Sequence, residues 1–313
     1  MKAGLIMLYF LQFDRQHLRL HCRNVVRVMA VLMSTASVTK IAAAAAPRAS
    51  MSWHAVDTAH FRIFSWQAPA ARSDDSHLES TCEGALTRLS MYWFGRVEQF
   101  KQKCDIILHP SDESYCREVG GNATHTAGAV LMGSDNQRPF FRIDLRANRS
   151  NWETAGLPHE LTHILFSQRF HGRKLPAWIN EGTALLADPA SKQALHLRDY
   201  RQARSSGTAL PLANLMSLTD YPAQRDWPVF YGQSLSLVKC LVERKSPQAF
   251  VEFIDKSLEK DYATGLREVY SISDVDELRQ VWSQYVSEPD AQLARANSSP
   301  RNRDSRKIKD PGQ

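Results

Sequence analysis

Two histidines four residues apart, with a glutamate directly after the first, are the residues of this sequence best suited to chemistry. They belong to the run His159-Glu160-Leu161-Thr162-His163. On a helix, residues four apart lie on the same side, one turn above the other, so the two imidazoles can share one ion. This is the H-E-x-x-H arrangement, in which two histidines bind zinc and the glutamate beside the metal acts as a general base. The run therefore predicts a metal centre with Glu160 as the proton acceptor.

A second segment offers the third protein ligand that a catalytic zinc site needs besides its open position. Glu181 lies eighteen residues after His163 and is the only carboxylate between His163 and Asp188. The alternative is a histidine six residues after His163, but that position holds Arg169, and His171 is out of register. The predicted ligands of one zinc ion are therefore His159, His163 and Glu181.

Prolines and apolar residues indicate that both segments are helical. Pro158 suits the first position of a helix, where its missing N–H needs no partner, and the apolar run 157–166 continues from it. Pro176 and Pro189 bracket the second helix. The alternative is an amphipathic surface helix that carries two exposed histidines, with an unrelated glutamate downstream. The second motif at this interval argues against it.

Together the two motifs resemble those of the gluzincins, specifically the peptidase MA-like group of bacterial zinc metallopeptidases. The resemblance covers about residues 52–286. It implies a zincin-like α+β fold, one Zn²⁺ per chain and hydrolysis of peptide bonds, with Glu160 passing a proton from water to the leaving amine. The residues that carry it are Leu157-Pro158-His159-Glu160-Leu161-Thr162-His163 and Pro176-Ala177-Trp178-Ile179-Asn180-Glu181-Gly182-Thr183-Ala184.

The resemblance also implies a second group that stabilises the oxyanion of the reaction. The segment 230–235 is similar to the Tyr-x-x-Ser segment that opens a later helix in that group, which makes Tyr231 the candidate phenol. Tyr221 and His171 are the fallbacks. The alternative for Tyr231 is a core tyrosine whose hydroxyl bonds locally.

Two further positions follow from the same comparison with gluzincins and from the helix pattern. In gluzincins an edge strand beside the metal helix pairs with the substrate backbone, and Gly128 and Ala129 are the matching candidates here. An ordinary hairpin strand is the alternative. Asp188 lies two turns beyond Glu181 and is a candidate partner for the second nitrogen of a ligand histidine, although a carboxylate from another loop could serve.

The type of peptide cleavage is suggested by a missing segment. The aminopeptidases of this clan carry a Gly-Met-Glu-Asn segment that binds the free amine of the substrate, and this sequence has none. Internal cleavage is therefore favoured over removal of N-terminal residues. The rival hypothesis is a non-catalytic gluzincin-like domain that binds peptide or cell-envelope material. Retention of Glu160 together with all three ligands argues against it, because a scaffold has no use for an acid at that position.

The net charge of +6 lies at the two ends of the chain. Residues 1–46 carry six Lys or Arg and one acid, and residues 287–313 carry six Lys or Arg and four acids. The part between them is therefore close to neutral, at −1. Nucleic-acid binders cluster positive charge on the folded domain, so nucleic acid is not an expected partner, and a peptide or protein substrate is.

The N-terminal segment predicts export. An apolar run over residues 25–46 follows basic residues and ends in five alanines before Pro47, which is typical of a cleaved secretory signal. The alternatives are an uncleaved N-terminal membrane anchor or a disordered leader. Besides Cys22 in this leader there are four cysteines, which could form disulfides in an oxidising compartment or remain buried thiols. These are Cys82, Cys104, Cys116 and Cys240.

Hydrophobic periodicity predicts an α+β domain with a small mixed sheet and a long helix before the metal-site helix, and a mostly helical part after it. The predicted organisation is a leader at 1–50, a catalytic domain at 51–286 with an α/β part at 51–170 and a helical part at 171–286, and a disordered tail at 287–313. The expected strands are 61–64, 105–109, 127–132 and 140–145. The expected helices outside the motifs are 74–100, 110–119, 191–204, 233–244, 247–258 and 274–286.

Overall fold

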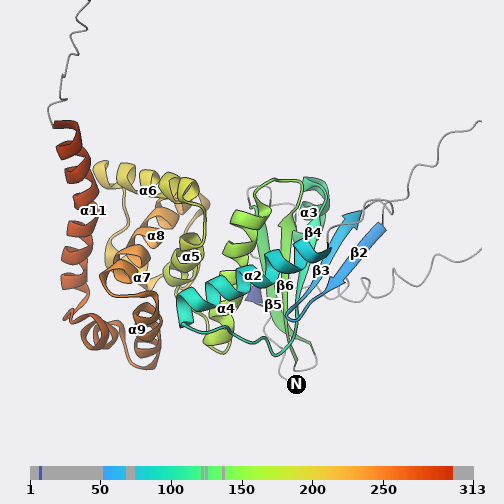
Figure 1. Ribbon diagram of the computed structural model, residues 1–313. Coiled ribbons are helices and arrows are strands. Elements are labelled where there is room, and N and C mark those ends of the chain that lie inside the picture. The colour runs from blue at the N-terminus through green and yellow to red at the C-terminus, as the bar shows by residue number, and fades with distance from the viewer. Residues whose placement is uncertain are drawn as a thin grey trace, which may run out of the picture. The chain divides into compact units, whose positions relative to one another are not determined.

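The computed structural model describes residues 7–8, 52–67, 75–120, 123, 126–135 and 138–298 (Figure 1). The chain divides into two compact units. The first comprises residues 1–175 and 183–193, and the second comprises residues 176–182 and 194–313. Helix α5 (Ala177–Leu186) begins in the second unit and ends in the first.

The first unit contains the sheet. Within the described residues six strands form one sheet in the order β1-β5-β6-β4-β3-β2. Strand β4 is parallel to β3 and to β6, and the other neighbouring pairs are antiparallel. The predicted α+β class with a small mixed sheet is therefore confirmed. The strands are β1 (Met7–Leu8), β2 (Ser52–Asp57), β3 (Phe61–Gln67), β4 (Cys104–His109), β5 (Gly128–Asp135) and β6 (Arg138–Arg146).

Helices α2 (Asp75–Phe94) and α4 (Leu157–Arg169) cover one face of this sheet (Figure 1). Alternate residues of β3 and β4 are buried under them, because successive side chains of a strand point to opposite faces. Apolar side chains at three- and four-residue spacing along α2 point into the same core, among them Leu78, Cys82 and Leu86. The core beneath α4 is completed by Leu161, Ile164 and Leu165.

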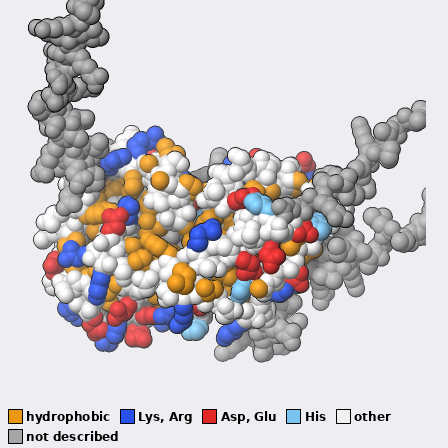
Figure 2. All heavy atoms as spheres, in the orientation of Figure 1, with side chains coloured by type: hydrophobic (Ala, Val, Ile, Leu, Met, Phe, Trp, Pro, Cys, Tyr) orange, Lys and Arg blue, Asp and Glu red, His pale blue; other side chains and the backbone are white. Residues whose placement is uncertain are grey.

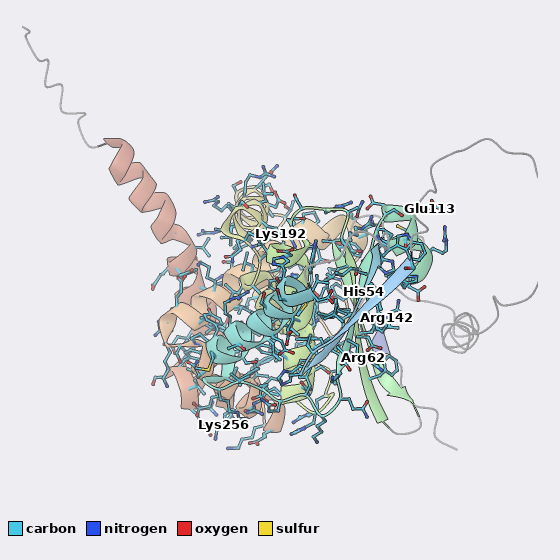
Figure 3. All side chains as sticks on the ribbon, turned by 45° about the vertical axis from the view of Figure 1, so that its right-hand side comes forward. His54, Arg62, Glu113, Arg142, Lys192 and Lys256 are labelled. Carbon is cyan, nitrogen blue, oxygen red and sulfur yellow. The ribbon has the colours of Figure 1, made fainter. Side chains whose placement is uncertain are left out.

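The opposite face of the sheet carries the short helix α3 (Asp112–Val119), which begins with Ser111 as its N-cap. Arg142 of β6, labelled in Figure 3, forms ion pairs with Asp144 on its own strand at 2.7 Å and with Glu118 of α3 at 2.9 Å. Asp144 also accepts a hydrogen bond from His109 at the end of β4, at 2.7 Å. Charged groups therefore attach α3 to this face.

The second unit is helical in its described part. The indole of Trp178 on α5 is fully buried, packs against Phe250 and Phe253, and donates to the hydroxyl of Tyr262 at 3.1 Å. Helix α8 is buried along most of its length. Besides α5, the elements are α6 (Ala190–Ser205), α7 (Leu212–Ser217), η3 (Gln224–Asp226), α8 (Trp227–Arg244), α9 (Pro247–Glu259), α10 (Tyr262–Gly265), η4 (Leu266–Tyr270) and α11 (Val275–Ser298).

The boundaries differ from the sequence prediction at several elements. Helix α2 ends at Phe94 and not near residue 100, because Gly95 adopts a left-handed conformation with φ of +69° that stops the helix. Helix α8 begins six residues earlier than predicted. Helix α11 continues to Ser298, through part of the segment predicted to be a disordered tail, where Ala, Gln and Leu favour helix.

The predicted leader lies outside the described residues apart from strand β1, and so do residues 299–313. Among the described helices, none has both the length and the apolar character that crossing a bilayer requires. The four cysteines Cys82, Cys104, Cys116 and Cys240 are free thiols, and all but Cys116 are buried. On the face shown in Figure 2, acidic and basic side chains are both widely spread.

Helix α5 comes into close contact with helix α8 at a glycine. A Cβ atom at Gly182 would lie 2.4 Å from Cγ2 of Val238 and 2.6 Å from the carbonyl oxygen of Ser234. These separations are shorter than any van der Waals contact, so only glycine permits the two helices to touch here. Close packing of the two helices therefore explains why a glycine follows Glu181 in the second motif.

We predict that Gly182→Ala lowers the free energy of unfolding by about 1–3 kcal/mol, because a methyl group overpacks the α5–α8 contact. Gly84→Ala on α2 is the matched control, since its Cβ would meet only the end of the Arg88 side chain, at 3.1 Å. There the better helix propensity of alanine should raise stability by up to about 1 kcal/mol. Urea denaturation of both variants measures the two effects, and equal shifts would contradict the packing argument.

Candidate metal centre

The first motif occupies the opening turns of α4. The π-helical turn η2 (Trp152–Gly156) leads directly into this helix, and Pro158 lies in its first turn, as predicted. All three motif side chains are buried: His159 is 9% exposed, Glu160 4% and His163 2%. The two imidazole rings lie 5.1 Å apart between centroids. The helical spacing therefore places both rings side by side, as the sequence predicts.

Glu181 forms, with His159 and His163, a group that could hold a metal ion. One potential ligand atom of each of His159, His163 and Glu181 lies within 4.8 Å of the others, and all three residues are buried. Glu181 itself is only 1% exposed. Two imidazoles and one carboxylate at these separations form a donor set that could hold a metal ion. The structure therefore brings together the three residues that the two motifs single out.

Asp188 lies beside the first histidine. Its Oδ1 atom is 3.4 Å from Nδ1 of His159, and its Oδ2 atom is 2.9 Å from the ammonium group of Lys192. Burial by itself raises the pKa of Asp188, but His159 and Lys192 more than offset this and hold that pKa below its usual range. Burial likewise lowers the pKa of His159, yet Asp188 raises it overall. Asp188, which the sequence suggests as a partner of a ligand histidine, is thus in contact with His159.

Glu160 packs against the first residue of β5. A Cβ atom at Gly128 would lie 2.7 Å from Cγ and 2.9 Å from Oε1 of Glu160, so any larger residue would occupy the space of this acid. Gly128 and Ala129 pair with Leu145 and Asp144 of β6 on one side. On the other side of β5, the short strand β1 pairs further along, at residues 131 and 132. The predicted strand is therefore adjacent to the predicted general base.

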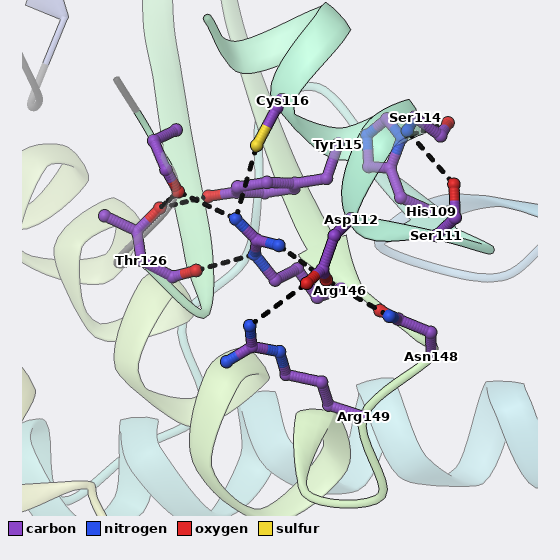
Figure 4. Close-up of polar contacts among 11 residues, drawn as sticks. His109, Ser111, Asp112, Ser114, Tyr115, Cys116, Thr126, Arg146, Asn148 and Arg149 are labelled. Atoms are coloured by element: carbon purple, nitrogen blue, oxygen red, sulfur yellow. Dashed lines mark hydrogen bonds and ion pairs between the residues drawn. The ribbon is translucent and has the colours of Figure 1, made fainter. Parts of the chain in front are cut away.

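A buried arginine fixes the segment that leads into Gly128 (Figure 4). Arg146 is 1% exposed and donates to the carbonyl oxygens of Ala123 and Thr126, both at 2.8 Å. Its guanidinium carbon lies 4.3 Å from the ring centroid of Tyr115, and the Tyr115 hydroxyl bonds that of Thr126 at 2.7 Å. Asp112 of α3 forms an ion pair with the same guanidinium. Arg146 therefore anchors the strand that packs on Glu160.

The residues considered as oxyanion donors have different surroundings. Tyr231 is half-buried on α8, and its ring contacts those of His196 at 5.8 Å and Trp227 at 6.3 Å. Tyr221 is also half-buried, and its hydroxyl donates to Oε1 of Glu181. His171 is exposed in the turn after α4, with a positive φ of 54°. Of these three residues, Tyr221 is therefore the one whose hydroxyl is hydrogen-bonded to the candidate ligand Glu181. The role of Tyr231 as oxyanion donor stays a prediction.

Several residues around the site were not found from the sequence. Lys192 follows Asp188 by four residues, so the helical rule for ion pairs could have suggested it. Arg146 and Tyr115 come from different elements, and their contact depends on the register of β6 and on the docking of α3. No local pattern marks a buried arginine. The contact between Arg146 and Tyr115 follows from tertiary structure alone.

Comparison of the sequence with known proteins assigns it to no family. No protein-family model matches the sequence, and no curated protein matches it at a significant level. The resemblance to gluzincins therefore rests on the two motifs and on the residues around them.

We predict that Gly128→Ala displaces the Glu160 side chain, because the new methyl group would overlap its Cγ atom. If Glu160 is the general base, activity should fall about 100-fold, the typical effect of misplacing a catalytic group by 1 Å. The metal content should stay unchanged, because His159, His163 and Glu181 are not touched. Kinetics together with metal analysis measure the two quantities separately.

Gly133→Ala is the matched control on the same strand. Its Cβ would come as close, 2.7 Å, to a ring atom of Phe140 and not to Glu160. Equal losses of activity in the two variants would contradict a specific effect on Glu160.

Proposed function

We propose that this protein is a zinc-dependent peptidase in which Glu160 acts as the general base. The observation that carries the proposal is the buried cluster of His159, His163 and Glu181, whose ligand atoms lie within 4.8 Å of one another. Glu160 stands between the two histidines on the same helix and is buried with them. A metal site with an acid beside it is the arrangement needed to activate water.

Zinc is the metal we propose, because the chemistry of the donor set fits it. Two imidazoles and one carboxylate are a known set of protein ligands for catalytic zinc, which leaves one position open. The contact of Asp188 with Nδ1 of His159 supports this choice, since ligand histidines commonly donate their other N–H to a carboxylate. One zinc ion per chain is therefore expected.

The chain's own residues divide the chemistry between them. A bound zinc ion would lower the pKa of water and polarise the carbonyl of the substrate. Glu160 cannot reach the ligand position from its place between the histidines, so we assign it to take the proton from the attacking water and to hand it to the leaving amine. Tyr231 remains the proposed hydrogen-bond donor to the oxyanion, a contribution of roughly 3 kcal/mol for such donors.

The proposed substrate is a peptide or protein cleaved internally. The edge of β5 at Gly128 and Ala129 is the proposed place for the substrate backbone, because it lies next to Glu160 and can add a strand. The mixed sheet followed by the metal-site helix and a helical part supports a zincin-like fold. Export of the protein is likewise proposed, from the signal-like pattern of residues 25–46.

The decisive test replaces the general base. Glu160→Gln keeps the size of the side chain but cannot accept a proton, so peptide cleavage should fall by about 10²–10⁴-fold. Metal analysis should find close to one zinc per chain in both the variant and the wild-type protein. Cleavage is read by mass spectrometry after incubation with a broad peptide library.

A matched control is Glu268→Gln, which removes an exposed carboxylate that pairs with Lys256 and Lys260. It should leave cleavage unchanged. Wild-type protein that contains full zinc but cleaves nothing in the library would refute the peptidase and favour a peptide-binding domain.

A further inference from the structure

A phenol on a distant segment holds the third candidate ligand. The hydroxyl of Tyr221 donates to Oε1 of Glu181, although the two residues are forty positions apart in the sequence. Glu181 is 1% exposed, and a buried carboxylate is costly unless hydrogen bonds replace its lost water. An ionised carboxylate only accepts hydrogen bonds, so the phenol is the donor.

We propose that Tyr221 is a positioning residue that orients the Glu181 carboxylate for metal binding and so sets the metal affinity of the site. This inference rests on the proposed metal centre and deepens it. Besides the hydrogen bond itself, three sets of contacts, all within the second unit, support the role.

The segment that carries Tyr221 is fastened to the start of α5. The backbone N–H of Ala177 donates to the carbonyl of Leu218 at 3.0 Å. The hydroxyl of Tyr262 donates to the carbonyl of Met216 at 3.2 Å and accepts from the indole N–H of Trp178 at 3.1 Å. Residues 177 and 178 lie one turn before Glu181 on the same helix. The segment that carries Tyr221 is therefore attached to the same helix as Glu181.

The ring of Tyr221 is itself fixed by aromatic contacts. It packs edge-on against Phe230 at 5.8 Å and against Trp227 at 6.5 Å between ring centroids. Phe230 is fully buried, and the indole N–H of Trp227 donates to the carbonyl of Pro222 at 3.1 Å. These contacts restrict the ring, so its hydroxyl is pre-positioned on the carboxylate.

The backbone on the other side of the ligand is also held. Gly182, directly after Glu181, lies against Ser234 and Val238 of α8 so closely that a methyl group would not fit. The main chain of Glu181 is thus fixed by helix packing, and its carboxylate is fixed by the phenol. A carboxylate held in one orientation loses less freedom when it binds a metal ion, which strengthens binding.

The experiment measures metal affinity in place of activity. Zinc dissociation constants are determined for the metal-free protein by competition with a chromophoric chelator. Tyr221→Phe should raise the dissociation constant by about 10–100-fold, the usual effect of removing a hydrogen-bond partner of a ligand. The visible spectrum of the cobalt-substituted protein should change as well, since the geometry of the carboxylate ligand is altered. Circular dichroism and urea denaturation of the metal-free variant establish that it is folded.

Tyr285→Phe is the matched control, because Tyr285 also donates to a glutamate, Glu243, at 2.7 Å, but on the surface. It should leave the dissociation constant within about twofold of wild type. A folded Tyr221→Phe variant with wild-type affinity and spectrum would overturn the positioning role. Wild-type protein that binds no zinc would instead overturn the metal centre itself, and with it this inference.

A second variant covers the case in which Tyr221→Phe does not fold. Trp227→Phe removes the indole bond to Pro222 but keeps the phenol. It should raise the dissociation constant in the same direction by a smaller factor, because the ring of Tyr221 loses part of its support. An unchanged constant in this variant would then count against the proposal.

Discussion

The burial of ionisable side chains is the constraint on which the rest of this structure depends. His159, Glu160, His163 and Glu181 are each no more than 9% exposed. Removing charged groups from water costs several kcal/mol for each ion unless partners replace the water. Residues outside the two motifs supply some of the contacts around these four side chains. Asp188 lies beside His159, Tyr221 donates to Glu181, and Gly128 packs against Glu160.

Each of the two acids of the site is associated with a glycine that allows a close approach of the backbone. Gly128 lets the first residue of β5 lie against the side chain of Glu160, and Gly182 lets α5 lie against α8 next to Glu181. Close packing excludes water from the acids, and electrostatic interactions are stronger where water is excluded. The same packing holds the side chain of Glu160 and the main chain of Glu181. The two glycines thus permit the close packing around the two acids, although neither has a side chain that could take part in chemistry.

The local parts of this arrangement could be predicted from the sequence, and the tertiary parts could not. The two helices of the site follow from Pro158, Pro176 and the periodic apolar residues, because helix starts and helix faces depend on neighbouring residues. Strand β2 was missed because it is a sheet edge whose side chains are exposed or half-exposed, so its pattern lacks a buried face. Tyr221 could not be assigned to Glu181, because their contact depends on how the segment after α7 returns to α5. A motif predicts candidate ligands, whereas the groups that contact them depend on the fold.

The contact between Asp188 and His159 also bears on which ring nitrogen is available to a metal ion. Asp188 lies at Nδ1, so we assign the proton of the neutral imidazole to that nitrogen and leave the lone pair of Nε2 for the ion. The assignment requires an ionised Asp188, although its side chain is fully buried. Lys192 meets this requirement, because its charge acts together with that of His159 to keep the carboxylate deprotonated. If a metal ion held His159 neutral, Lys192 would remain as the cation beside Asp188, so the carboxylate could continue to orient the ring.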